Sequence, residues 1–337
     1  MGRHANISIF VPHLGCPHRC SFCDQRAITG QVALPTAEEV EAAVRRGIET
    51  GFGGAKTAEI AFFGGSFTAI NRGEMLRLLD AACPFVRSGA VQGIRISTRP
   101  DAIDREVLGL LAARGVTAIE LGAQSMEDEV LEKNRRGHTP RDVETAAAMI
   151  RACGFSLGLQ MMTGLPGDSD AGALRTAERL IALQPETVRI YPLLVLRGTE
   201  VARLYEAGEY VPQSLEAAVS LCARLLGRFE TAGVRVIRLG LHTVKEESLL
   251  AGPWHPAFSE LCYGRRYLEA FAAAFAGREK GTYTLLVGPG ERSKAAGQRR
   301  CNIVALEKGG WNVKIQESPA VVPGRFEMIK GRKPTCC

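Results

Sequence analysis

The sequence contains no apolar run long enough to cross a membrane, and its mean hydropathy is close to zero. Its first residues, MGRHANISIF, lack the apolar middle and the small-residue cleavage site of a secretory leader, and they predict an early β-strand instead. Low-complexity tracts are also absent. We therefore expect an ordinary globular, cytoplasmic protein with no membrane partner.

The ten cysteines do not indicate disulfides, because a chain of 337 residues is not a short secreted scaffold. In a reducing cytoplasm, clustered cysteines indicate a metal or catalytic site instead. Four scattered cysteines are predicted to be small packing residues: Cys83, Cys153, Cys222 and Cys262. Cys301, Cys336 and Cys337 offer ligands for a second cluster, but neighbouring cysteines in a frayed terminus are poor rigid ligands.

Positive charge is concentrated in the last part of the chain. Residues 278–337 contain 12 Lys and Arg against 5 Asp and Glu, a balance of +7, whereas the whole chain carries +6. The remainder of the chain is therefore close to neutral. The basic tail indicates a polyanionic partner, and a merely solvated surface is the alternative.

Short apolar runs alternate with longer helical stretches, which predicts a parallel sheet with crossover helices. The predicted strands are residues 7–11, 59–63, 94–98, 118–122, 156–162 and 187–191. Thr36 and Glu39 fit a capping box at the start of one helix. Six βα units predict an incomplete (β/α)6 TIM-like barrel, an α/β fold whose chemistry gathers at the carboxyl ends of the strands.

These patterns divide the chain into three parts. Residues 1–198 form the predicted partial barrel, and residues 199–277 form a mixed helical and β extension packed on it. A break at GREKG opens a small C-terminal α+β basic module with its tail, residues 278–337.

Three cysteines lie in one short loop, GCPHRCSFC, directly after the first predicted strand. The thiolates of Cys16, Cys20 and Cys23 can hold three irons of a [4Fe–4S] cluster and leave the fourth iron open to substrate or cofactor. The alternative is a zinc site completed by His18 or Asp24. The position after a strand and the motifs below favour the cluster.

The spacing Cys-x3-Cys-x2-Cys, with the aromatic Phe22 before the last cysteine, is identified as the signature of the radical S-adenosylmethionine (radical SAM) superfamily. The resemblance implies two cofactors, a [4Fe–4S] cluster and S-adenosylmethionine. It also implies that one electron, from a flavodoxin- or ferredoxin-type donor, cleaves S-adenosylmethionine to a 5′-deoxyadenosyl radical. Phe22 is then expected beside the cofactors.

Glycines and polar residues that follow the other predicted strands are expected to hold S-adenosylmethionine. Gly64 and Gly65 let a bound amino acid approach the backbone closely, and in the superfamily this segment contacts the methionine amino group. The further candidates are Ser97, Arg99, Glu120, Gln124 and Met162. For Arg99 and Glu120 the alternative is a salt bridge inside the barrel mouth, and for Met162 it is plain core.

Four segments, ISTRPD, IELGAQSMEDEVLEKNRRGHT, GLQMMTGLPGD and VRIYPLLVLRGTEVARLYEAGEY, resemble the family of Elp3, the catalytic subunit of Elongator. That family modifies the wobble uridine of transfer RNA (tRNA) using acetyl-CoA, so the resemblance implies a tRNA partner and a tRNA-modifying transferase. Tyr191 and Arg197 carry the resemblance most distinctively and are the candidate catalytic residues. The residues after Arg278 are too few for an acetyltransferase domain, which leaves the carbon donor open.

The basic module is predicted as strand, helix, turn, helix and strand over residues 281–317. This order is similar to the core of a KH domain, in which a GXXG loop between two helices clamps a nucleic-acid backbone. Here the loop begins at Gly297 and has Arg300 in place of the second glycine. The candidate phosphate contacts are Arg292, Lys294, Arg299 and Arg300. A basic but inert appendage is the alternative.

The sequence thus favours a radical SAM enzyme that modifies a tRNA uridine, and it leaves two rivals. One is a radical SAM enzyme for a small molecule such as a porphyrin precursor, for which the basic tail is dispensable. The other is a non-catalytic RNA-binding protein that uses its cluster for structure or redox sensing. An open iron position argues against the second rival.

Overall fold

The computed structural model describes residues 5–12, 20–23, 33–50, 58–241 and 246–331. The chain forms two compact units. The first unit contains residues 1–213 and 228–253, and the second, the C-terminal unit, contains residues 214–227 and 254–337. Within the described ranges, no helix has the length and apolarity that a membrane crossing requires.

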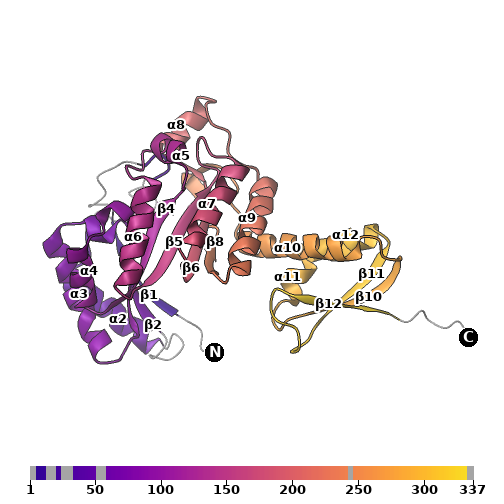
Figure 1. Ribbon diagram of the computed structural model, residues 1–337, viewed down its shortest axis with the longest axis horizontal. Coiled ribbons are helices and arrows are strands. Elements are labelled where there is room, and N and C mark those ends of the chain that lie inside the picture. Colours follow the sequence, from indigo (N-terminus) through magenta and orange to yellow (C-terminus); the bar gives the residue numbers. More distant parts are fainter. Residues whose placement is uncertain (1–4, 13–19, 24–32, 51–57, 242–245, 332–337) are drawn as a thin grey trace, which may run out of the picture. The chain divides into compact units, whose positions relative to one another are not determined.

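A sheet of parallel strands forms the centre of the first unit (Figure 1). It consists of β1 (Ala5–Val11), β2 (Ala58–Gly64), β3 (Gly93–Thr98), β4 (Val116–Gln124), β5 (Ser156–Thr163), β6 (Thr187–Pro192) and β8 (Arg235–Leu239). The strands are ordered β1-β2-β3-β4-β5-β6-β8, so their carboxyl ends meet at one edge. The predicted α/β partial barrel is confirmed, and it has one strand more than expected.

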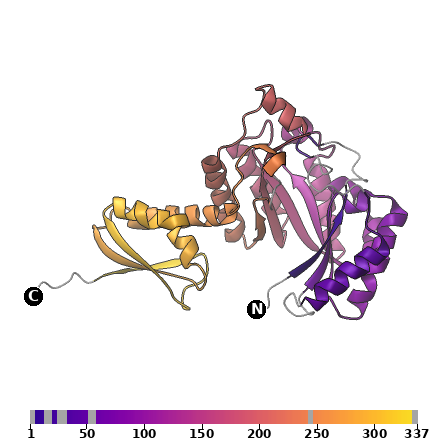
Figure 2. The same cartoon turned by 180° about the vertical axis from the view of Figure 1, so that it is seen from behind.

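Helices cover one face of this sheet. In Figure 1 α6 and α7 lie in front of the strands, whereas the view from behind in Figure 2 looks onto the strands themselves. The helices of this unit are α2 (Ala37–Glu49), α3 (Arg72–Arg87), α4 (Arg105–Ala112), α5 (Asp128–Lys133), α6 (Pro140–Ala152), α7 (Asp170–Ala182) and α8 (Glu200–Glu206). Thr36 and Glu39 form the predicted capping box of α2. Short 3-10 turns span Phe67–Ala69, Pro100–Ala102 and Glu246–Ser248.

The strand of this sheet that the sequence pattern did not predict is β8, which among the described strands pairs with β6 alone, at the edge of the sheet. Its sequence, RVIRL, contains two arginines among three aliphatic residues, and Arg235 and Ile237 are exposed. An edge strand tolerates such charged side chains, and so it carries no continuous apolar signal. A further antiparallel pair, β7 (Val195–Leu196) and β9 (Leu249–Ala251), follows the ends of β6 and β8 along the chain.

The C-terminal unit has its own three-stranded sheet, ordered β11-β10-β12. Its elements are α10 (Phe258–Phe275), β10 (Gly281–Val287), α11 (Arg292–Ala296), a 3-10 turn (Gln298–Arg300), α12 (Cys301–Lys308), β11 (Trp311–Glu317) and β12 (Phe326–Lys330). β10 is parallel to β11 and antiparallel to β12. The predicted order of strand, helix, turn, helix and strand is therefore present, with β12 added. α9 (Leu215–Thr231) contains residues of both units.

Aromatic side chains of α10 form the core of the C-terminal unit. Tyr267, Phe271 and Phe275 are buried in one cluster with side chains of β10 and β11. The rings of Phe275 and Tyr283 meet edge to face with centroids 5.0 Å apart. Because α10 supplies this core, the C-terminal unit begins before residue 277, where the sequence placed the boundary.

Candidate active site

The described part of the cysteine loop, residues 20–23, contacts a buried asparagine. Of the three predicted cluster ligands, Cys20 and Cys23 are described, and Cys16 lies outside the described residues. The Cys23 amide donates to the Cys20 carbonyl oxygen at 3.2 Å and closes a turn between them. Inside this turn the Ser21 hydroxyl donates to Asn134 Oδ1 at 2.6 Å. Asn134 is fully buried and its amide donates to two backbone carbonyls, so the loop has a rigid anchor.

A cavity of about 260 Å³ lies beside the cysteine loop, at the carboxyl ends of the strands. The predicted residues that line it are Cys20, Phe22, Cys23, Gly64, Gly65, Ser97, Arg99, Gln124, Met162 and Tyr191. Glu120 and Arg197, also predicted, are not among its lining residues. The apolar part of the lining adds Leu193, Leu194, Leu196 and Leu241. The cavity thus combines convergent polar groups with an apolar wall, as ligand sites commonly do.

Two glycines of the cavity lining, Gly64 at the end of β2 and Gly65 after it, pack tightly against the end of β1. Gly64 has a φ of +115°, and a Cβ there would lie 2.4 Å from the ring of Phe10. A Cβ on Gly65 would lie 2.8 Å from the carbonyl oxygen of Pro12. A side chain at either position would collide with the end of β1, so the tight contact between β1 and this segment requires glycine there.

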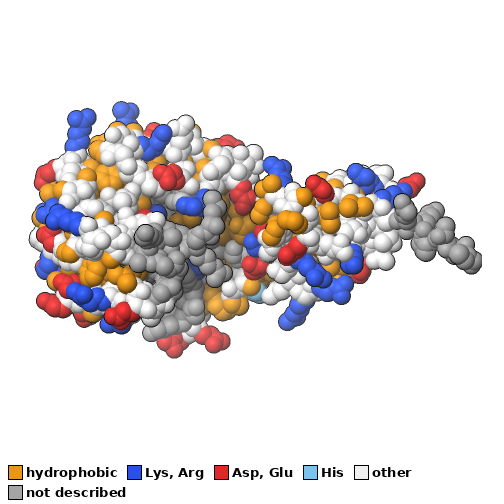
Figure 3. All heavy atoms as spheres, turned by 90° about the horizontal axis from the view of Figure 1, so that it is seen from below, with side chains coloured by type: hydrophobic (Ala, Val, Ile, Leu, Met, Phe, Trp, Pro, Cys, Tyr) orange, Lys and Arg blue, Asp and Glu red, His pale blue; other side chains and the backbone are white. Residues whose placement is uncertain are grey.

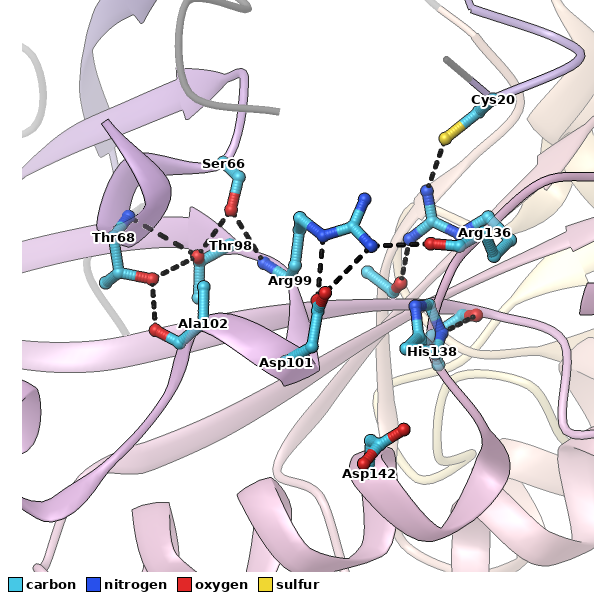
Figure 4. Close-up of polar contacts among 12 residues, drawn as sticks. Cys20, Ser66, Thr68, Thr98, Arg99, Asp101, Ala102, Arg136, His138 and Asp142 are labelled. Carbon is cyan, nitrogen blue, oxygen red and sulfur yellow. Dashed lines mark hydrogen bonds and ion pairs between the residues drawn. The ribbon is translucent and has the colours of Figure 1, made fainter. Parts of the chain in front are cut away.

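Hydroxyl groups next to the glycines fix the end of β3 (Figure 4). Thr98 Oγ1 lies 2.9 Å from Ser66 Oγ and 2.6 Å from Thr68 Oγ1. Ser66 Oγ also accepts a hydrogen bond from the Arg99 amide at 3.1 Å. The buried Arg99 side chain pairs with Asp101, with 2.7 Å between Nε and Oδ1. Arg99 therefore lines the cavity while also forming a salt bridge, the alternative considered for it.

Arg136 directs its guanidinium at the cysteine loop (Figure 4). Its Nη1 donates to Cys20 Sγ at 3.0 Å, and its Nη2 donates to the carbonyl oxygen of Gly122 at 2.6 Å. The same guanidinium lies 5.9 Å from the centroid of the Phe22 ring. A buried cation at this place offsets the negative charge that cysteine thiolates bring to the cavity.

Glu120 lies outside the cavity lining and inside an ion-pair network. Its carboxylate is 1% exposed and accepts from Arg189 at 2.6 and 2.8 Å and from Gln160 at 3.0 Å. Gly158 on β5 makes this possible, because a Cβ there would lie 2.8 Å from Glu120 Cγ. Burial alone would lower the pKa of Arg189, but its hydrogen bonds and charge attraction to Glu120 outweigh burial and raise that pKa.

His138 lies in the same turn as Arg136 and is buried. Its Nε2 is 3.2 Å from the carbonyl oxygen of Ala123. Burial, followed by the nearby Arg136 charge, lowers the pKa of His138 to about 4. The ring is therefore neutral at neutral pH, with Nε2 donating to Ala123.

The two candidate catalytic residues lie in different surroundings. Tyr191, at the end of β6, lines the cavity, and burial raises the pKa of its phenol, so it stays protonated and able to donate. Arg197 is exposed, and its Nε donates to the carbonyl oxygen of Glu247 at 3.0 Å. The structure thus places Tyr191 at the cavity and Arg197 away from it.

The predicted phosphate contacts lie in the C-terminal unit but not all in one place. Arg292 and Arg300 line an open groove, and Arg299 is exposed in the turn beside Arg300. Lys294 instead pairs with a buried glutamate at 2.9 Å. The groove also contains Lys314 of β11, which the sequence did not single out because only the fold brings this strand beside the turn.

Comparison of the sequence with models of protein families identifies the superfamily of this chain. The model of the Radical SAM superfamily matches residues 10–180, about half of the chain. The chain belongs to this superfamily. A second model, the Radical_SAM C-terminal domain, matches residues 185–269. The cofactors are therefore those of radical SAM proteins, a [4Fe–4S] cluster and S-adenosylmethionine.

Individual relatives of this chain agree with the predicted resemblance to Elp3. An uncharacterized protein of Methanocaldococcus jannaschii is 30% identical over 72% of this chain and 77% of its own length. The tRNA uridine(34) acetyltransferase of the same organism is 33% identical over 37% of this chain, which spans only 24% of that protein. The structure of Elp3 from Methanocaldococcus infernus, with residues 1–46 deleted, aligns with a TM-score of 0.65 at 21% identity, over 81% of this chain and 64% of its own. That structure supports the fold alone.

The described residues fit the two radical SAM cofactors. Cys20 and Cys23 line the same cavity as the glycines, although no group of three metal-ligating side chains occurs among the described residues, from which Cys16 is missing. Two buried polar atoms of this cavity, Gln124 Oε1 and Arg136 Nε, have no hydrogen-bond partner in the described part of the chain. Such atoms normally find partners, so they suit a polar ligand.

Proposed function

We propose that this chain cleaves S-adenosylmethionine reductively and uses the radical to modify a tRNA, at the wobble uridine. The observation that supports this most is the single cavity that is lined by two of the proposed cluster cysteines, the glycines at the end of β2 and an apolar wall. The tRNA substrate is proposed from the similarity to the tRNA uridine(34) acetyltransferase over 129 residues.

The chain's own residues would divide the work as follows. Cys16, Cys20 and Cys23 would hold the cluster, which supplies one electron that breaks a carbon–sulfur bond of S-adenosylmethionine and releases methionine and a 5′-deoxyadenosyl radical. Gly65 would admit the methionine part of the cofactor, while Gln124 would accept a hydrogen bond from it. The apolar lining would exclude water from the radical.

Tyr191 is proposed to orient the substrate by donating a hydrogen bond, since its phenol keeps its proton. A flavodoxin- or ferredoxin-type protein is proposed to supply the electron. Ser97, Met162 and Phe22 complete the proposed cofactor contacts from the polar and apolar sides of the cavity.

The test is anaerobic. Protein reconstituted with iron and sulfide is given dithionite and S-adenosylmethionine, and 5′-deoxyadenosine is measured with and without bulk tRNA. We expect tRNA to raise the yield, and nucleoside mass spectrometry of the tRNA then identifies the product. Cleavage that RNA leaves unchanged would favour a small-molecule substrate, and no cleavage at all would contradict the proposed enzyme.

Two variants and one control sharpen this test. Cys20→Ala removes a cluster ligand and should abolish the iron colour and the cleavage. Gly65→Ala places a Cβ 2.8 Å from a backbone oxygen and should reduce cleavage while the iron content persists. Gly109→Ala is the matched control, because a Cβ at this α4 position meets nothing within 4 Å and its activity should be unchanged.

A further inference from the structure

The C-terminal unit contains a groove of about 620 Å³ between α11, α12 and β11. Three cations line it, Arg292, Arg300 and Lys314, and a single anion, Glu317, accompanies them. Among the described residues none of these cations forms an ion pair, whereas Lys294 and Lys330 of the same unit are both paired with glutamates. Charge complementarity therefore favours an anionic occupant.

The groove is a fixed feature, because the turn that carries Arg300 is anchored. Arg299 and Arg300 have φ values of +52° and +62°, which side chains rarely adopt. A Cβ on Gly297 would lie 2.6 Å from Cys301 Sγ, so the turn packs tightly against α12. The Asn302 side chain, 1% exposed, donates to carbonyl oxygens of α10 and α11. The strained turn is thus held by the fold and presents Arg300 from a defined place.

The groove also has an apolar floor and a free strand edge. Ile303, Val313 and Ile315 line the groove from the hydrophobic core of the unit, each at most 7% exposed, and form its floor. β11 is the outer strand of its sheet, and no described strand pairs with its other edge. Figure 3 shows Lys and Arg side chains beside hydrophobic and acidic ones on the visible face of this unit. This combination suits a ligand with an anionic backbone and flat, partly apolar groups that carry hydrogen-bonding edges.

We propose that this groove binds a single-stranded segment of RNA. Phosphates would contact Arg292, Arg300 and Lys314, and bases would lie over the floor beside the edge of β11. A duplex keeps its bases stacked inside and could not use the floor, and an acidic peptide has no flat bases to place there. The proposal rests on the proposed function in one respect, namely that the strand belongs to the RNA substrate.

The test measures binding of a labelled oligouridylate, which forms no duplex, to the full-length protein over a range of salt concentrations. Lys314→Ala should weaken binding and make the salt dependence shallower by about 0.7 in log–log slope, the value for one lost phosphate contact on a single strand. Lys330→Ala removes the same charge from β12 and should leave the slope unchanged. Glu317→Gln removes the groove's anion and should tighten binding.

Three results would contradict the proposal that the groove binds single-stranded RNA. Equal losses in Lys314→Ala and Lys330→Ala would mean that only the total charge attracts RNA. Duplex RNA bound as tightly as the single strand, or polyglutamate displacing it at equal charge, would assign the groove to another occupant. Each outcome is read without any enzymatic activity.

Cleavage assays separate this proposal from the proposed function. Without RNA, Lys314→Ala should form 5′-deoxyadenosine as the wild type does, since Lys314 is outside the cavity lining. If tRNA stimulates cleavage equally in the wild type and in Lys314→Ala, the proposed RNA-binding role of the groove is wrong, whereas the proposed tRNA substrate is still supported. If the groove binds oligouridylate as expected but tRNA never stimulates cleavage, the proposed tRNA substrate is wrong, whereas the proposed RNA-binding role of the groove is still supported.

Discussion

The cavity of the first unit and the groove of the C-terminal unit hold their charged side chains in opposite ways. Gln160 of the cavity lining donates to Glu120, which pairs with Arg95 and Arg189, and these three charged side chains are mostly buried. In the groove, Arg300 and Lys314 are exposed and form no ion pair within the described residues. Buried pairs fix geometry at a high desolvation cost, whereas exposed cations keep their charge available to a ligand. The first arrangement fits the proposed cleavage site, and the second fits the proposed RNA surface.

Breaking the buried network should have the largest effect on stability. Glu120→Gln leaves the Arg189 guanidinium buried without its carboxylate, and we expect a loss of about 3–5 kcal/mol in the free energy of unfolding. The measurement is urea unfolding at neutral pH. Glu127→Gln, which breaks the exposed pair with Arg175 at 2.6 Å, is the control and should cost far less. Similar losses in the two variants would contradict the contrast between buried and exposed charge.

The buried His138 makes the first unit sensitive to acid. Its pKa is about 4 in the folded state, and the ordinary value near 6.5 applies when it is unfolded, so the unfolded state binds the proton first. Stability is unaffected above pH 6.5 and falls as the pH drops towards 4, by about 3 kcal/mol in all.

His138→Gln should flatten this part of the pH profile, measured as the unfolding midpoint between pH 7 and pH 4. Burial also raises the pKa of Asp168, to about 6, which acts in the opposite direction over the same range. The difference between wild type and variant isolates the histidine, because Asp168 is present in both. A difference that does not grow as the pH falls would refute the assignment.

The anchor of the cysteine loop gives a smaller effect with a specific readout. Asn134→Ala removes the acceptor of the Ser21 hydroxyl and should cost about 1–3 kcal/mol, because buried partners are left unsatisfied. The loosened loop should also release iron faster to a chelator. Asn71→Ala, which removes the N-cap of α3, is the control: it lowers stability by a comparable amount and should leave iron retention unchanged. Equal iron loss in both would make Asn134 a purely structural residue.

The sequence predicted most of the cavity because strand ends are visible in it. Each of six apolar runs became a strand, and residues just after them, such as Gly65 and Gln124, line the cavity. Pairings between strands were not predictable. Glu120 reaches Arg189, 69 residues away, because Gly158 leaves space above β5, and neither register nor that gap is visible in the sequence. From the sequence, Glu120 was therefore a candidate ligand contact with a salt bridge as the alternative, and the structure shows the salt bridge.

The sequence predicted that the C-terminal unit is basic, but it did not predict which basic residues line the groove. The basic composition pointed to Arg292 and Arg300, which line it, and equally to Lys294, which is paired elsewhere. Lys314 is indistinguishable in sequence from any exposed lysine on a strand, and only the parallel pairing of β10 with β11 brings it to the groove. Surface sites depend on such long-range placement, and composition alone does not provide it.

Arg300 has a strained backbone and also a proposed phosphate contact. Two variants at this position separate these roles, and they have the smallest predicted effect on stability. Glycine adopts a φ of +62° without the steric penalty of a side chain, so Arg300→Gly should stabilise the protein by about 1 kcal/mol. Arg300→Ala keeps the strained backbone and should not stabilise it. Both variants lose the guanidinium, so both should weaken oligouridylate binding to the same extent. Thermal unfolding and RNA titration of the pair therefore test the strain and the phosphate contact separately, and tighter binding by Arg300→Gly would show that the groove prefers an unobstructed glycine loop over the arginine.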